Sequence, residues 1–151
     1  MRIEQAHPDD VPALARLLWL DTRGVEPERP SVDAFAGQLA RWWATCEATH
    51  VAFVARMPEA GVVGMAWIAF APRVPRPGAV VRMSGDVQSV FVVPEMRGRG
   101  IGSALVSAAA EHAERYGAAR VTVHSGRRAV PLYERLGFAP SPQLLLRPPE
   151  A

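Results

Sequence analysis

The chain has 151 residues, of which 49% are apolar, and a formal net charge of +2. This length and composition are typical of one ordinary domain with a buried core, and they exclude a disordered chain. The basic residues are scattered along the chain rather than clustered, which argues against nucleic acid as a partner.

Three absences narrow the functional classes further. All 17 basic residues are arginine, which excludes Walker-type nucleotide chemistry because that chemistry needs a lysine after its glycine loop. The single cysteine, Cys46, allows neither an internal disulfide nor a cysteine-based zinc site, and the histidines lack ligand spacing, so no metal is expected. The first residues, MRIEQAHPDD, do not form a signal peptide, and no apolar run reaches membrane-spanning length. We therefore expect a soluble cytoplasmic protein that binds no membrane.

Apolar periodicity in the N-terminal half predicts a strand, two helices and two further strands. The first helix carries apolar residues at helical spacing from Val11 to Leu18 and can be capped by Asp9 or Asp10. The second helix follows a segment of turn formers and acids, and Ser31 is its expected N-cap. The three strands are expected over residues 2–6, 50–56 and 62–70.

The C-terminal half begins with the proline-rich loop PRVPRPG and then alternates strands and helices. The expected strands cover residues 80–93, 120–124 and 143–147, and the expected helices cover residues 100–116 and 127–136. Two strand-helix-strand passes predict parallel pairing within a mixed sheet, because a crossover helix returns the chain in the same direction. The fold class is therefore α/β with a mixed sheet.

The segment VVPEMRGRGIGSAL places three glycines and two arginines at the start of a helix. Residues 97–102 offer no side chain that could cap the first N–H groups, and Arg97 and Arg99 are unfavourable beside the positive end of a helix dipole unless an anion lies there. A phosphate or pyrophosphate satisfies both requirements. The alternative is a flexible loop that enters a helix, with Ser103 as a late cap. A dinucleotide fold fails because its fingerprint needs glycine at position 103 and an acid where His124 ends the next strand.

Two motifs together resemble the GNAT N-acetyltransferase superfamily. The run Arg97-Gly98-Arg99-Gly100-Ile101-Gly102 fits the R/Q-x-x-G-x-G/A signature of that family, and PLYERLGF over residues 131–138 is similar to its second hallmark. The resemblance is strong over residues 86–138 and hardly extends to residues 21–43, which in the family help to build the acceptor site. It implies a single GNAT domain over residues 1–151, with splayed central strands.

The resemblance also implies an enzyme that moves an acetyl group from acetyl-CoA to a primary amine by direct attack in a ternary complex. The backbone of Phe91, Val92 and Val93 would pair with the pantetheine amides of acetyl-CoA, because unpaired strand groups are a template for an amide-bearing ligand. The glycine loop would hold the pyrophosphate through Arg97, Gly98, Arg99, Gly100, Ile101, Gly102 and Ser103. The acceptor, a small molecule or a peptide or protein amine, stays open.

Tyr133 is the residue expected to carry the chemistry, because a tyrosine at its place in the family gives a proton to the departing thiolate. The base is left open. Many family members carry a glutamate where Gln88 stands, so this departure points to Asp86, to a water chain, or to an amine that arrives neutral. Asp86 is equally read as a solvated residue at the start of a strand. Strand alternation predicts Asp86, Gln88, Val90 and Val92 on one face of the sheet.

Other residues are candidates for the walls of the cleft. His124 and Ser125 follow a parallel strand, and ligands gather at such strand ends. The acids of the poorly matched segment could attract a cationic amine or form a solvated loop; they are Asp21, Glu26, Glu28 and Asp33. The competing class is a non-catalytic acyl-CoA-binding sensor, and a homodimer is left open because many family members pair through sheet edges or C-terminal strands.

Overall fold

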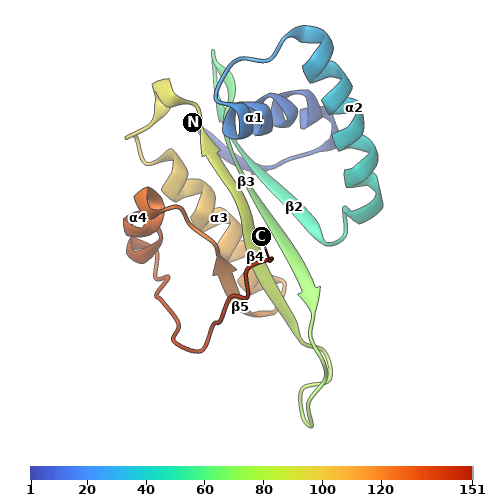
Figure 1. Cartoon of the computed structure of the whole chain (residues 1–151), viewed down its shortest axis with the longest axis vertical. Coiled ribbons are helices and arrows are strands. Elements are labelled where there is room, and N and C mark those ends of the chain that lie inside the picture. Colours follow the sequence, from blue (N-terminus) through green and yellow to red (C-terminus); the bar gives the residue numbers. More distant parts are fainter. Residues whose placement is uncertain (151) are drawn as a thin grey trace.

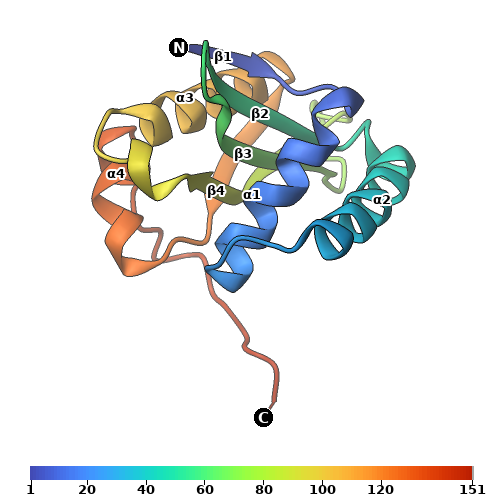
Figure 2. The same ribbon diagram turned by 90° about the horizontal axis from the view of Figure 1, so that it is seen from above.

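The computed structural model describes residues 1–150 and contains one five-stranded mixed sheet with helices on both faces (Figures 1 and 2). The elements are β1 (Arg2–Gln5), α1 (Val11–Arg23), α2 (Arg29–Cys46), β2 (His50–Met57), β3 (Gly61–Pro72), β4 (Met83–Val92), α3 (Ile101–Arg115), β5 (Ala118–Val123) and α4 (Val130–Arg135). The strands lie in the order β1-β2-β3-β4-β5. The first three pairs are antiparallel and β4 pairs with β5 in parallel. This arrangement confirms the predicted mixed sheet. Within residues 1–150, no helix is both long enough and apolar enough to cross a membrane.

Helices α1 and α2 cover one face of the sheet and α3 covers the other (Figure 2). On the first face, Trp67 of β3 packs edge-on against Trp43 of α2, with ring centroids 5.1 Å apart. On the second face, Gly85 of β4 lies so close to α3 that an added Cβ would stand 3.6 Å from the Cβ of Ala113. Leu105 of α3 is fully buried against the sheet. Because both faces are packed, the C-terminal end of β4 and the start of α3 are held in fixed positions.

Helix α2 begins three residues earlier than the sequence predicts. It starts at Arg29 after Glu28, so the expected N-cap at Ser31 is wrong. Pro30 takes the second position of the helix, where its missing N–H costs nothing and its fixed φ suits the first turn.

Two expected strands differ at the C-terminal side of the chain. Strand β4 begins at Met83 rather than near residue 80, and Val81 before it is 92% exposed. The strand expected over residues 143–147 is absent, and Leu145 within it is 88% exposed. Prolines at positions 140, 142, 148 and 149 flank this segment and cannot donate to a strand ladder. The chain therefore makes one strand-helix-strand pass, around α3, instead of two.

A β-bulge in β4 overturns the predicted alternation of its side chains. Trp67 of β3 is opposite Ser89 and the next residue, Ile68, is opposite Val87, so Gln88 is the extra residue. The bulge exchanges the two faces: Asp86 shares its face with Ser89, which lies opposite Trp67 on the side of α2. Val92 instead lies toward α3, where its Cγ2 would stand 3.9 Å from a Cβ at Gly102. Asp86 and Val92 therefore do not share a face.

Candidate functional site

The parallel strands β4 and β5 separate before β4 ends. Their pairing runs from Met83 with Ala118 to Val87 with Val123 and then stops, whereas β4 continues to Val92 with only β3 as its neighbour. A cleft of about 840 Å³ opens beside the unpaired part of β4 and reaches the start of α3 and α4. The splayed central strands that the sequence resemblance implied are therefore present.

The backbone groups that face this cleft belong to alternate residues of β4. Val93 donates its N–H to the carbonyl of Val63 at 2.9 Å, so the backbone of Val93 is directed to β3. In an antiparallel ladder every second residue exchanges both bonds with its partner. Phe91 therefore also faces β3, and Val90 and Val92 present their backbone groups to the open side. Of the three residues expected to pair with pantetheine, Val92 fits this geometry, whereas the backbone of Phe91 and Val93 is directed to β3.

The glycine segment turns the chain from the end of β4 into α3. Gly98 and Gly100 have φ of 74° and 79°, which is left-handed backbone that side chains other than glycine rarely adopt. Gly100 is the N-cap of α3 and no side chain caps the helix. The first intrahelical bond runs from the N–H of Ala104 to the carbonyl of Gly100 at 3.0 Å. The N–H groups of residues 101–103 thus precede the helical ladder, and these residues line the cleft, as expected for an anion site.

Arginines give the cleft a positive charge. Arg97 donates Nε–H to the carbonyl of Val92 at 2.9 Å, and its guanidinium carbon lies 5.3 Å from the centre of the Phe91 ring. Arg128 and Arg135 also line the cleft, from the turn before α4 and from its last residue. The sequence did not single out these two, although Arg135 lies within the PLYERLGF segment and Arg128 just before it. The expected Arg99 is exposed and is not among the residues that line the cleft.

A smaller pocket of about 210 Å³ adjoins the cleft where β4 and β5 separate. Six polar or titratable side chains from four elements and loops line it: Asp21, Gln88, Ser89, His124, Ser125 and Tyr133. Both expected strand-end residues, His124 and Ser125, therefore border the pocket. Asp21 lines the large cleft as well, as do Val90 and Ala129, and it is the only titratable side chain that the two cavities share.

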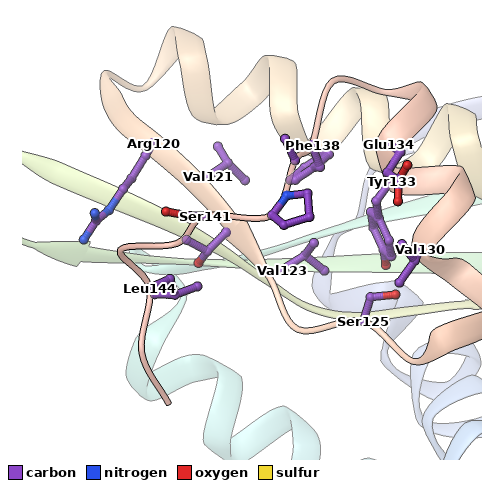
Figure 3. A pocket seen from close by; sticks show the side chains of 13 residues that line it. Arg120, Val121, Val123, Ser125, Val130, Tyr133, Glu134, Phe138, Ser141 and Leu144 are labelled. Carbon is purple, nitrogen blue, oxygen red and sulfur yellow. The ribbon is translucent and has the colours of Figure 1, made fainter.

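Tyr133 of α4 is buried between two pockets. Its side chain is 8% exposed, and its ring packs edge-on against Phe138 with centroids 5.5 Å apart. On its other side it lines a pocket of about 400 Å³ between β5, α4 and the C-terminal segment, where Figure 3 shows its ring extending toward Val130 and Ser125. Burial raises the pKa of the Tyr133 phenol above its ordinary value. The phenol is therefore protonated at neutral pH and is able to give a proton.

The two residues of β4 that were expected as base candidates have different surroundings. Gln88, at the bulge, is exposed and lines the smaller pocket. Asp86 lines neither the cleft nor that pocket: its Oδ1 accepts a hydrogen bond from the Thr122 hydroxyl of β5 at 2.8 Å. The two side chains also meet, because the Gln88 amide donates a hydrogen bond to Oδ2 of Asp86 at 3.5 Å.

Cys46 ends α2 and lies away from both pockets, with its thiol 3.4 Å from the carbonyl of Trp42. It is therefore not placed to act as a nucleophile. Among residues 1–150, no three His, Cys, Asp or Glu side chains lie together as metal ligands would.

Comparison with known proteins gives a consistent picture. The family model described as "Acetyltransferase (GNAT) family" matches residues 11–138. A glucosamine 6-phosphate N-acetyltransferase of Trypanosoma brucei brucei is 35% identical over 81 residues, which are 54% of this chain and 53% of that enzyme, so the match spans about half of the relative. The crystal structure of a Trypanosoma brucei acetyltransferase is similar with a TM-score of 0.73 and 26% identity, covering 97% of this chain and 98% of the other.

A further structural neighbour was solved with a ligand. It is a predicted acetyltransferase with acetyl-CoA from Clostridium acetobutylicum, with a TM-score of 0.71 over 97% of this chain and 95% of the other. At 18% identity this likeness shows the fold alone.

Proposed function

The chain belongs to the acetyltransferase (GNAT) family, and we propose that it transfers the acetyl group of acetyl-CoA to a primary amine by direct attack in a ternary complex. One observation carries the proposal: the open backbone edge of β4 leads directly to the uncapped N-terminus of α3. An extended ligand with amides along its length and a diphosphate at one end fits both features in one pose. Acetyl-CoA is such a ligand.

Each part of the cleft has a task in this proposal. The N–H groups of residues 101–103 and the arginines Arg97, Arg128 and Arg135 bind the phosphates. The backbone of Val90 and Val92 pairs with the pantetheine arm. This pairing orients the thioester, and a free N–H of the strand polarises its carbonyl as negative charge develops on the oxygen.

Tyr133 acts at the other end of the reaction. The amine nitrogen attacks the thioester carbon, the carbon–sulfur bond breaks, and the phenol gives its proton to the departing thiolate. The raised pKa of Tyr133 keeps that proton in place until the thiolate forms. Both substrates are bound together, so no covalent enzyme intermediate is needed.

The acceptor is proposed only as a class, a molecule with a primary amine. The curated relative is named for glucosamine 6-phosphate, which makes an aminosugar phosphate one member of the panel to test. The other members are a polyamine, an aminoglycoside, an amino acid, and peptides with a free N-terminus or lysine.

Release of free thiol tests the proposal. The protein is incubated with acetyl-CoA and each amine, and the thiol is followed with a chromogenic disulfide reagent against a control without amine. We expect amine-dependent thiol release with at least one member of the panel. If calorimetry showed that acetyl-CoA binds but no amine caused thiol release, the protein would instead be a non-catalytic acyl-CoA sensor. Such a sensor would also tolerate glutamine in place of glutamate at position 88.

A further inference from the structure

Asp21 is the single carboxylate among the residues that line the cleft and the smaller pocket. It lies in the last turn of α1, two residues before the helix ends at Arg23. The pocket places it with Gln88 and Tyr133, at the point where the two strands separate. Asp21 therefore lies where the part of the cleft proposed for the thioester meets the smaller pocket, which is free for the acceptor.

The other side chains near the pocket are less suited than Asp21 to accept a proton from the amine. Gln88 has no basic group, because its side-chain amide cannot take up a proton at neutral pH. The Asp86 carboxylate is bonded to Thr122 and lines neither pocket. Tyr133 is needed in its protonated form for the thiolate. Asp21 is thus the acidic residue that the fold brings to the reaction space.

The surroundings of Asp21 suit a base. Although the side chain is open to the cleft, the cleft walls displace enough water to raise the pKa of the Asp21 carboxyl, and the positive charge of Arg97 offsets part of that rise. A raised pKa strengthens the carboxylate as a proton acceptor. The other titratable groups that face the two cavities come from the glycine loop, the end of β5 and α4: Arg97, His124, Arg128, Tyr133 and Arg135.

We propose that Asp21 is the general base of the reaction and that the acceptor enters as its ammonium ion, held beside this carboxylate. This inference rests on the proposed acetyl transfer. It also limits the acceptor to amines that are protonated at neutral pH and can bring the ammonium group into a narrow pocket of about 210 Å³.

The proton balance of the step is complete. One N–H bond of the ammonium breaks and its proton goes to the Asp21 carboxylate, which leaves a neutral amine with a free electron pair. That pair forms the bond to the thioester carbon, and the carbon–sulfur bond breaks. The second proton lost by nitrogen replaces the one that Tyr133 gives to sulfur, and Asp21 later returns its proton to water. The products are an amide, the free thiol of coenzyme A and one proton.

Asp21→Asn is the principal test variant, because it keeps the shape of the side chain and removes its basicity. Asp21→Glu restores a carboxylate, and Asp9→Asn is the matched control. Asp9 is an exposed aspartate near the other end of α1. It precedes Asp21 by 12 residues, which corresponds to about 18 Å at the rise of a helix. The readouts are kcat/KM for the best amine between pH 5 and pH 10, and the Kd of acetyl-CoA by calorimetry.

The wild-type protein should lose kcat/KM below the pKa of Asp21, because the base is then protonated. Asp21→Asn should reduce kcat/KM at pH 7 about 100-fold or more, and its kcat/KM should rise about tenfold per pH unit up to the pKa of the amine, because only free amine then reacts. Asp21→Glu should recover at least tenfold over the asparagine variant. The Kd of acetyl-CoA should be unchanged or lower, because a negative charge near Arg97 has been removed.

Three results would overturn the inference, and they can be told apart. If Asp21→Asn kept the wild-type activity and the same fall of kcat/KM at low pH, Asp21 would not be the base, although acetyl transfer would still stand. If Asp86→Asn instead lost the fall of kcat/KM at low pH, the base would be Asp86. No transfer by the wild-type protein to any amine would refute the proposed function and, with it, the role of Asp21.

Discussion

Replacement of Ser103 by aspartate tests the anion site at the start of α3. Ser103 is the third residue of the helix, is half-buried, and lines the cleft beside the uncapped N–H groups. A carboxylate at this position satisfies the same N–H groups that the diphosphate of acetyl-CoA would use. The substitution should therefore change stability and ligand affinity in opposite directions.

The magnitudes follow from simple electrostatics. An acidic residue in the first turn of a helix stabilises it by about 0.3–1 kcal/mol, which for a chain of this size raises Tm by about 1–4 °C. Two like charges at about 4 Å repel by about 1 kcal/mol in water and more in a cleft with fewer water molecules. A diphosphate carries two such charges, so the loss of binding is at least about 2 kcal/mol, or about 30-fold in Kd.

Calorimetry with acetyl-CoA and thermal unfolding measure both effects on the same sample. Ser103→Asn is the control, since it has nearly the same shape without the charge, and its Kd should stay within about threefold of the wild-type value. If Ser103→Asp bound acetyl-CoA as tightly as Ser103→Asn, the anion would not lie at the start of α3, and the electrostatic reasoning would be refuted.

Three further predictions concern the acid, an ion pair and the core. Tyr133→Phe should lower kcat about 100-fold with no change in the Kd of acetyl-CoA, and a variant with wild-type kcat would show that Tyr133 is not the acid. Because burial raises the pKa of the Tyr133 phenol, the wild-type protein should show no loss of kcat from this group below about pH 10. Asp10→Asn should cost about 1–3 kcal/mol in urea unfolding at pH 7, because Asp10 accepts hydrogen bonds from Arg56 and from the N–H of His7. Burial would raise the pKa of Asp10, but these hydrogen bonds outweigh burial and lower it. The difference in unfolding free energy between wild type and Asp10→Asn should therefore shrink as the pH falls below the ordinary pKa of 3.8. A difference that persisted in acid would contradict the ion pair. Leu105→Ala should destabilise the protein by about 2–5 kcal/mol in the same assay, and a cost under 1 kcal/mol would mean that α3 does not pack on the sheet as described.

The uncapped glycine turn at the start of α3 could be predicted from the sequence because local chemistry defines it. Glycines at positions 98 and 100 are needed for left-handed backbone, and the absence of a capping side chain can be read from six residues. The parallel pairing of β4 and β5 followed in the same way from one crossover helix.

The remaining features depend on contacts between distant segments. The bulge at Gln88 arises where β4 meets β3, and no local pattern in residues 83–92 indicates it. Asp21 reaches the pocket because α1 packs across the sheet, so the sequence alone left it as one of several acids in a loop. The strand expected over residues 143–147 is absent because an apolar run can form a strand only beside a partner strand, and the flanking prolines disfavour such pairing.

A crystal structure with acetyl-CoA would show whether the coenzyme lies along β4 and on the start of α3. We expect the diphosphate on the N–H groups of residues 101–103, and the pantetheine arm between β4 and β5, hydrogen-bonded to the backbone of Val90 and Val92. Acetyl-CoA bound elsewhere, with the start of α3 free of phosphate and β4 free of the pantetheine arm, would contradict this expectation.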